Sequence, residues 1–328
     1  MSIKLFGTWT LSHNRLILRR GLRWGRALKN FEFFSPFNLE LSKALASAKI
    51  IGIGAHSDDL DFMCLSAIEA GRKAGASNFL GVVVSDGSGS TRGEAFKDLS
   101  PAAFAEVRKR EQREAATWAS YSGVIQLNHS SALIRQAKAE KLESDFLEIF
   151  GNGKIETVFT HSPFDRHPTH RALCVHLLRA LQKLPKSRRP KKVIGCEVWR
   201  SLDWIPASKK IIFPVSSSES QMKTLFDLYQ SQIVGAKNYT QAVIGRKRSN
   251  ATFSESHLAD NSAFAEYGID LTAVATGKIT LQKYAQQMLD LFQQEILKEL
   301  KPYRETSNGN HHRKKPIKRI KSRSKSRR

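Results

Sequence analysis

Short apolar runs alternate with longer amphipathic stretches between about residue 48 and residue 200. The runs are continuous, which is typical of strands buried on both faces of a parallel sheet. We expect five such strands, at residues 49–56, 79–87, 123–128, 155–163 and 191–199. Helical periodicity separates them, at residues 58–75, 101–121, 135–150 and 168–183. This order predicts an α/β fold, a Rossmann-like three-layer sandwich with a mostly parallel sheet.

The pattern becomes less regular after Trp199. Helical periodicity returns at residues 216–234 and 280–302, and the polar, basic stretch GAKNYTQAVIGRKRSNATFSESH lies between them. We interpret residues 200–305 as a C-terminal cap and substrate region of one domain that spans residues 48–305. The chain has no apolar run of about 18 residues, so no transmembrane helix is expected.

The formal net charge of +23 is concentrated at the two ends of the chain. Residues 306–328 contain ten Lys and Arg and no acid, and residues 1–30 contain seven and no acid. We expect a basic N-terminal extension at residues 1–47 and a disordered basic tail at residues 306–328. These ends could contact an anionic partner, either nucleic acid or a membrane surface. The first 30 residues could equally form a targeting segment or a helix packed on the domain.

The three cysteines, Cys64, Cys174 and Cys196, lie in apolar stretches without paired spacing. We interpret them as reduced core residues, which excludes a disulfide framework and a zinc ribbon. The apolar core of a secretory signal is missing, so we expect a cytoplasmic protein, with the basic ends possible contacts for the inner membrane surface.

Candidate chemistry gathers at the ends of two predicted strands. His56, Asp58 and Asp59 follow the first strand, and His167 and His170 open the helix after the fourth. Ligands of parallel sheets bind outside the carboxyl ends of the strands. Taken alone, two histidines three residues apart, or two acids at a helix start, are more often surface, core or capping residues. Together they predict a metal site.

The residue types suit a catalytic zinc ion. Such an ion takes three protein ligands, leaves a position for water and lowers the pKa of that water to about 7. A second carboxylate could take the proton of the water. An imidazole on the opposite side could stabilise the oxyanion and protonate a leaving amine.

Three stretches resemble motifs of the LmbE-like, or PIG-L, N-deacetylases. AHSDDLD (55–61) resembles the AHPDDxE motif, HPTHRA (167–172) resembles HPDHRA, and EVRKREQREAA (106–116) resembles the intervening R-x-x-E helix. The resemblance covers roughly residues 48–275. Softer similarity in GCEVWRSLDWIP and LYQSQIVGAKNYTQAVIGRKRSNATF is shared with a bacterial subgroup that is sometimes fused to a glucosamine-6-phosphate deaminase.

The resemblance implies a role for each motif residue. His56, Asp59 and His170 match the ligands of one zinc ion per chain. Asp58 matches the general base that deprotonates the metal-bound water, and His167 matches the imidazole that stabilises the tetrahedral intermediate and assists departure of the amine. The implied reaction is hydrolysis of the N-acetyl group of an N-acetylglucosamine-type sugar or conjugate, by attack of zinc-bound water.

The chain departs from the family pattern at three positions. Ser57 replaces Pro, Asp61 replaces Glu, and Thr169 replaces the Asp of HPDH. The missing Asp would lie beside the catalytic imidazole, so its loss could lower the pKa of His167. We expect Asp165 to take over that orienting role.

Substrate contacts are open to more than one interpretation. Arg92 follows the second strand and could bind sugar hydroxyls or a phosphate, or it could be a solvated loop residue. Arg246, Arg248 and Asn250 could hold an anionic aglycone, or they could belong to a basic cap surface. Aromatic residues such as Trp199 could line a sugar site or lie in the core.

His129, His161 and His176 match no motif partner, and we interpret them as structural. Two other functions stay open. One is a basic nucleic-acid- or membrane-binding protein on a degenerate deacetylase fold. The other is a zinc amidase that acts on a thiol-sugar conjugate.

Overall fold

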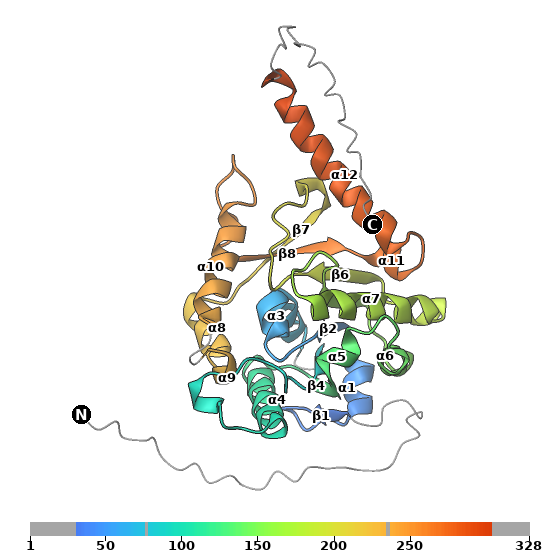
Figure 1. Cartoon of the computed structure of the whole chain (residues 1–328), viewed down its shortest axis with the longest axis vertical. Coiled ribbons are helices and arrows are strands. Elements are labelled where there is room, and N and C mark those ends of the chain that lie inside the picture. Colours follow the sequence, from blue (N-terminus) through green and yellow to red (C-terminus); the bar gives the residue numbers. More distant parts are fainter. Residues whose placement is uncertain (1–30, 76–77, 234–236, 304–328) are drawn as a thin grey trace, which may run out of the picture.

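The computed structural model describes residues 31–75, 78–233 and 237–303 (Figure 1). The expectations for residues 1–30 and for the tail at residues 306–328 concern segments outside this part of the chain. The three cysteines all lie within it. Each is buried and free, as the sequence predicts.

One eight-stranded sheet forms the centre of the fold, in the order β1-β4-β3-β2-β5-β6-β8-β7. The five strands from β4 to β6 run parallel, and β1, β8 and β7 pair antiparallel at the two edges. The predicted α/β fold with a mostly parallel sheet is therefore confirmed. The strands are β1 (Glu32–Phe34), β2 (Ile50–Gly54), β3 (Phe79–Ser85), β4 (Gly123–His129), β5 (Thr157–His161), β6 (Lys192–Cys196), β7 (Lys210–Pro214) and β8 (Ala265–Asp270).

Helices cover both faces of this sheet and make three layers (Figure 1). Two buried apolar clusters, one on each face, hold the layers together. The first cluster takes residues from α1 (Leu41–Ser47), α5 (Ser131–Ile134), α6 (Glu140–Asn152), α7 (Pro168–Lys183), α11 (Thr272–Ala275) and α12 (Leu281–Leu300). The second takes residues from α2 (Asp59–Met63), α3 (Leu65–Lys73), α4 (Pro101–Trp118), α8 (Glu219–Phe226) and α10 (Tyr239–Thr252), with α9 (Gln230–Ile233) beside α10.

The domain begins earlier than the sequence indicates. Strand β1 pairs with β4, and Ala44 and Leu45 of α1 are fully buried in the first cluster. The predicted boundary after residue 47 is therefore wrong for residues 31–47, which are part of the fold. These residues include an amphipathic helix of only seven residues, too short to give a clear period.

Residues 200–303 extend the sheet as well as covering it. Strands β7 and β8 continue it beyond β6, and the stretch that shows only polar and basic character contains α10. That helix buries Lys247, whose ammonium group bonds the Phe62 carbonyl at 2.8 Å and the carboxylate of Glu266. Because Lys247 is buried against a partner distant in the chain, the hydrophobic pattern of α10 does not show which face of the helix is buried.

The helix predicted at residues 58–75 is divided at Cys64, which lies between α2 and α3 with φ −141°. The carboxylate of Glu266 on β8 accepts hydrogen bonds from the Leu65 and Ser66 amides, each at 3.0 Å. This side chain caps the new helix start from a strand 200 residues away. The helix predicted at residues 168–183 is confirmed at its predicted bounds.

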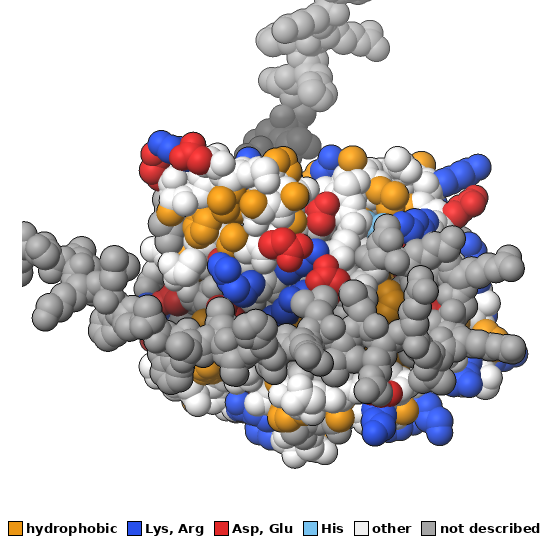
Figure 2. All heavy atoms as spheres, turned by 90° about the horizontal axis from the view of Figure 1, so that it is seen from below, with side chains coloured by type: hydrophobic (Ala, Val, Ile, Leu, Met, Phe, Trp, Pro, Cys, Tyr) orange, Lys and Arg blue, Asp and Glu red, His pale blue; other side chains and the backbone are white. Residues whose placement is uncertain are grey.

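Helix α12 extends away from the body of the molecule (Figure 1) and buries only Tyr284 and Met288. Among the described helices, none is long and apolar enough to span a bilayer. The visible described surface in Figure 2 mixes basic, acidic and apolar side chains. This mixture agrees with a body that carries little of the chain's net charge.

Candidate metal centre

The site lies where β2 and β5 end side by side. These strands pair in parallel from Ile50 to Ile53, so their carboxyl ends meet at one edge. The turn after β2 carries His56 and Asp59, and α7 begins beyond β5. Gly54 allows the close approach, because a Cβ there would lie 3.0 Å from the Cβ of Asp59.

Three donor atoms of the predicted ligands converge. The His56 Nδ1 atom lies 3.1 Å from His170 Nε2 and 3.3 Å from Asp59 Oδ2, and His170 Nε2 lies 3.4 Å from Asp59 Oδ2. In a tetrahedral zinc site with bonds of about 2.0–2.1 Å, ligand atoms are about 3.3 Å apart. The three side chains therefore fit one metal ion, and their N₂O donor set suits zinc.

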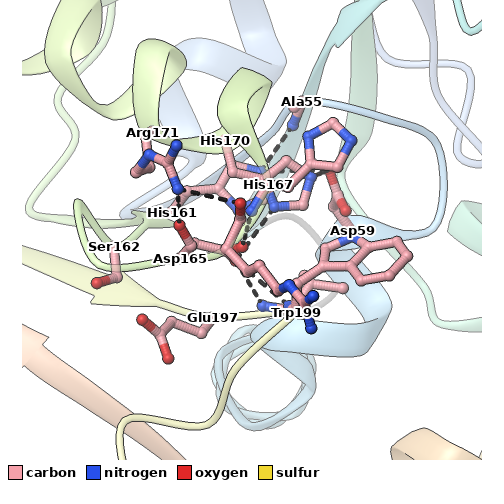
Figure 3. A network of polar contacts seen from close by, with 12 residues as sticks. Ala55, Asp59, His161, Ser162, Asp165, His167, His170, Arg171, Glu197 and Trp199 are labelled. Atoms are coloured by element: carbon pink, nitrogen blue, oxygen red, sulfur yellow. Dashed lines mark hydrogen bonds and ion pairs between the residues drawn. The ribbon is translucent and has the colours of Figure 1, made fainter.

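Asp165 sets the orientation of His170 (Figure 3). Its Oδ2 atom lies 3.1 Å from His170 Nδ1 and accepts the Val198 amide at 2.9 Å. Because Nδ1–H donates to Asp165, the lone pair of Nε2 faces the cluster. Burial opposes ionisation of Asp165, but the hydrogen bond and charge of His170 outweigh it and lower the pKa to about 2. Burial lowers the pKa of His170 to about 4, which keeps the ring neutral.

Asp58 and Asp59 are adjacent carboxylates with opposite shifts. Burial, reinforced by Asp59, Glu111 and Asp61, raises the pKa of Asp58 well above its ordinary value, although Arg108 opposes this. Burial also acts on Asp59, but His170 and His161 hold its pKa well below the ordinary value. Such a pair can divide into a proton acceptor and an ionised ligand.

The backbone of Asp58 is strained. Its φ is 94°, in the left-handed region that non-glycine residues avoid at a cost of about 1–3 kcal/mol. The Asp58 amide donates to the Gln112 side chain at 3.3 Å, and the following helix α2 is pinned by packing. On the other side of this turn, Arg108 Nη2 lies 3.6 Å from the Asp58 carboxylate.

His167 lies at the N-cap of α7 and faces the cluster. Its ring centroid is 4.5 Å from that of His170 and 5.0 Å from that of His56. The Nδ1 atom accepts the Thr169 amide at 3.3 Å, so the neutral ring carries its proton on Nε2. Burial and the neighbouring His56 lower the pKa of His167. The donor atoms of His56, His167 and His170 also lie within 4.8 Å of one another, so His167 is a possible alternative ligand.

Two of the predicted substrate residues, Arg246 and Arg92, differ in their contacts with the site. Arg246 bonds the carbonyl of Val198, whose amide binds Asp165, so this guanidinium borders the metal centre. Arg92 bonds the Ser88 carbonyl at 3.3 Å and lies over the ring of Phe104. Within the described residues, no contact links Arg92 to the cluster.

The structure does not bring Arg248 and Asn250 to the site. Arg248 is exposed and forms an ion pair with Glu219. Asn250 is buried, donates to the Ala265 carbonyl at 3.4 Å and accepts Tyr267 through its backbone carbonyl. Neither residue contacts the donor cluster in the described part of the chain, so their roles stay predictions. Arg246 and Asn250 are four residues apart and share one face of α10, where both line a pocket with Glu197 and Val198, whereas Arg248 lies on another face.

Two further residues lie at the site: Arg108, to which the sequence assigned no role, and Trp199, which the sequence left open between a sugar site and the core. Arg108 is buried, donates to the Ser57 carbonyl at 2.6 Å, and has Nε and Nη1 without a partner in the described chain. Trp199 is 36% exposed, and its ring centroid lies 5.9 Å from that of His167. Arg108 is the Arg of the R-x-x-E motif, and Trp199 lies in GCEVWRSLDWIP, so the sequence contains a weak indication of a site role for each.

The departures from the family pattern have different consequences. Asp61 accepts the hydroxyls of Tyr121 and Tyr229, and burial raises its pKa to about 6, so it is a structural acceptor. Thr169 is fully buried, and its hydroxyl has no partner in the described chain. Asp165 accepts the His167 amide at 2.8 Å but contacts the His170 ring, so its orienting effect falls on the ligand rather than on the His167 ring.

Comparison with known proteins supports the resemblance in the motifs. The PIG-L family, described as GlcNAc-PI de-N-acetylase, matches residues 51–181. The fold is similar to N,N'-diacetylchitobiose deacetylase from Pyrococcus horikoshii, with a TM-score of 0.55, 17% identity, and coverage of 72% of this chain and 88% of that chain. The comparison with curated protein sequences gave no match.

Two further solved structures share the fold. A conserved protein from Thermus thermophilus has a TM-score of 0.52 and 17% identity, and covers 68% of this chain and 94% of its own. A triple mutant of a deacetylase in teicoplanin biosynthesis has a TM-score of 0.51 and 16% identity, with coverage of 68% and 97%. At such identities these likenesses establish the fold alone.

Proposed function

We propose that this chain, whose residues 51–181 match the PIG-L family, hydrolyses the N-acetyl group of an N-acetylglucosamine-type sugar or conjugate with one bound zinc ion. The observation that carries the proposal is the convergence of donor atoms from His56, Asp59 and His170 beside a separate buried carboxylate, Asp58. A structural zinc site would use a fourth protein ligand, whereas three ligands leave room for water and substrate.

Zinc bound to these donors would polarise the amide carbonyl and supply a nucleophilic hydroxide at neutral pH. Asp58 would take the proton of the attacking water. Its raised pKa suits this task, because the carboxyl can hold the proton and then deliver it to the departing amine. Asp59, whose pKa is low, stays ionised as a ligand.

His167 would stabilise the charge that develops on the amide oxygen. The proton on Nε2 is available for this, since Nδ1 already accepts the Thr169 amide. The lowered pKa of the ring favours a neutral hydrogen-bond donor over an acid. Protonation of the amine therefore falls to Asp58, while His167 holds the oxygen.

The walls of the site suit a sugar. Trp199 offers an aromatic face beside His167, with Lys237 4.6 Å above its ring centroid. Arg108 lies 3.6 Å from the Asp58 carboxylate and Arg246 bonds the Val198 carbonyl, and guanidinium groups bind hydroxyl oxygens or a phosphate in fixed directions. These features support an amino-sugar substrate with a polar or anionic aglycone.

The experiment is a panel of acetate-release assays. The substrates are N-acetylglucosamine, its 6-phosphate, its nucleotide diphosphate, a lipid-linked form and a thiol-sugar conjugate. Protein stripped by a chelator and protein reloaded with zinc are assayed together. Release that depends on zinc supports the proposal and ranks the aglycones, and turnover of the thiol-sugar conjugate alone would favour the alternative amidase. No release from any substrate by protein that binds zinc would contradict the proposal.

A further inference from the structure

A third buried histidine lies directly beneath the proposed ligands. His161 is the last residue of β5 and is fully buried. The neighbouring strand β2 ends one residue before Ala55, whose amide bonds the His161 ring. It belongs to neither of the two ligand motifs, and the sequence alone indicates a structural residue.

The His161 ring contacts both Asp59 and His170. Its Nε2 atom lies 3.2 Å from Asp59 Oδ2. The ring stacks on that of His170, with centroids 3.8 Å apart and an interplanar angle of 16° (Figure 3). The donor atoms of the three side chains lie within 4.8 Å of one another.

The hydrogen bonds define which atom of His161 faces the carboxylate. The Ala55 amide donates to Nε2 at 3.0 Å, so this nitrogen acts as an acceptor. Asp59 Oδ2 is also an acceptor, and it already receives the His56 amide at 2.7 Å. Two hydrogen-bond acceptors at this distance repel each other, and a cation bound to one of them offsets the repulsion. A metal ion on the far side of Asp59 Oδ2 would provide that attraction.

Stacking argues against His161 as a ligand in its own right. A metal ion binds an imidazole nitrogen in the plane of the ring. Two nearly parallel rings about 4 Å apart cannot both direct their lone pairs at one ion without tilting. His161 therefore supports the ligands from below and leaves the ion to His56, Asp59 and His170.

We propose that His161 is a positioning residue of the metal centre, which limits rotation of the His170 ring and holds the Asp59 oxygen toward the ion. The proposal rests on the metal site of the proposed function. The Ala55 bond, the Asp59 contact and the stacking hold the ring, while Nδ1 is buried without a partner in the described chain. Loss of the Ala55 bond or of the stacking should loosen both ligands.

The test compares two substitutions at this position. His161→Phe keeps a flat ring for stacking but offers no acceptor to Ala55. His161→Gln keeps an acceptor oxygen at a similar reach but removes the ring. The control is His176→Phe, a buried histidine of α7 that bonds Glu143 and the Gln136 carbonyl outside the cluster. Circular dichroism establishes that each variant folds before metal is added.

Two readouts do not depend on turnover. Zinc affinity is measured by competition with a chromophoric chelator, and the visible spectrum of the Co²⁺-substituted protein reports ligand geometry. We expect both His161 variants to bind zinc roughly 10–100-fold more weakly than the unsubstituted chain, as for other outer partners of metal ligands, with altered Co²⁺ bands. The control should keep its affinity and its spectrum.

The outcomes separate this inference from the proposed function. Folded His161 variants with unchanged zinc affinity and unchanged Co²⁺ bands would overturn the positioning role while the metal centre stands. An equal loss in His176→Phe would overturn it as well, since the effect would then be general. An unsubstituted chain that binds no zinc would overturn both.

Discussion

The carboxylate of Asp165 contacts both histidines at the start of α7. One oxygen lies 3.1 Å from His170 Nδ1, and the other accepts the backbone amide of His167 at 2.8 Å. The oxygen beside His170 also accepts the Val198 amide at 2.9 Å. This one buried side chain therefore orients the His170 imidazole and holds the backbone of His167.

Asp165→Asn should weaken zinc binding by roughly 10–100-fold, the range for partners of ligating histidines. The amide cannot offer a charged acceptor to His170, so the ligand loses basicity and direction. Chelator competition measures the change. Asp203→Asn, an exposed residue of the following loop, is the matched control and should bind as the unsubstituted chain does. Equal affinities in the two variants would show that Asp165 does not tune the ligand.

Asp165 should also make the metal-free protein sensitive to acid. Its pKa of about 2 in the fold lies below the value of about 3.9 for an unfolded chain, so the unfolded state binds the proton more tightly. The stabilisation is complete above about pH 5, is lost as pH falls through 2, and amounts to about 2–3 kcal/mol. Urea unfolding of protein in chelator from pH 6 to pH 2 measures it. Asp165→Asn should show a shallower fall; parallel curves would refute the assignment.

Arg108→Lys should raise KM for an amino-sugar substrate about tenfold, because one ammonium group replaces a fork of donors. The buried Nε and Nη1 atoms are the donors at issue. Steady-state kinetics on zinc-loaded protein measure the effect. Arg110→Lys on the exposed face of the same helix is the control. An unchanged KM in Arg108→Lys would remove this residue from the substrate wall.

Deletion of residues 306–328 should leave kcat/KM within about twofold. The site residues named above all lie in the described part of the chain, and residues 306–328 carry ten Lys and Arg and no acid. Binding to anionic vesicles and to duplex DNA, measured at low and high salt, reports what the basic residues do contact. Loss of all hydrolysis on deletion would contradict the view that the tail is accessory.

The sequence predicts the parts of the site that depend on short motifs. His56, Asp58 and Asp59 follow a strand in one turn, and His167 and His170 share the first turn of a helix. Their proximity follows because parallel strands place their carboxyl ends at one edge. The sequence alone therefore places each of these residues at the correct strand end.

The rest depends on partners distant in the chain. His161 acquires its place only because β5 pairs with β2, and Glu266 caps α3 from a strand that the sequence does not indicate. The predictions at Arg246, Arg248 and Asn250 also depend on distant partners. Basic and polar character along α10 does not show which side faces the centre, since Lys247, between Arg246 and Arg248, is buried.

The measurement that tests the central claim most directly is acetate release by zinc-loaded protein and by Asp58→Asn, with bound zinc counted in both. The carboxylate is outside the ligand set, so the variant should bind one zinc ion per chain as the unsubstituted chain does. Without the proton acceptor, release should fall by roughly 100-fold or more. Equal release by the two proteins, or no release by either with zinc bound, would contradict the account.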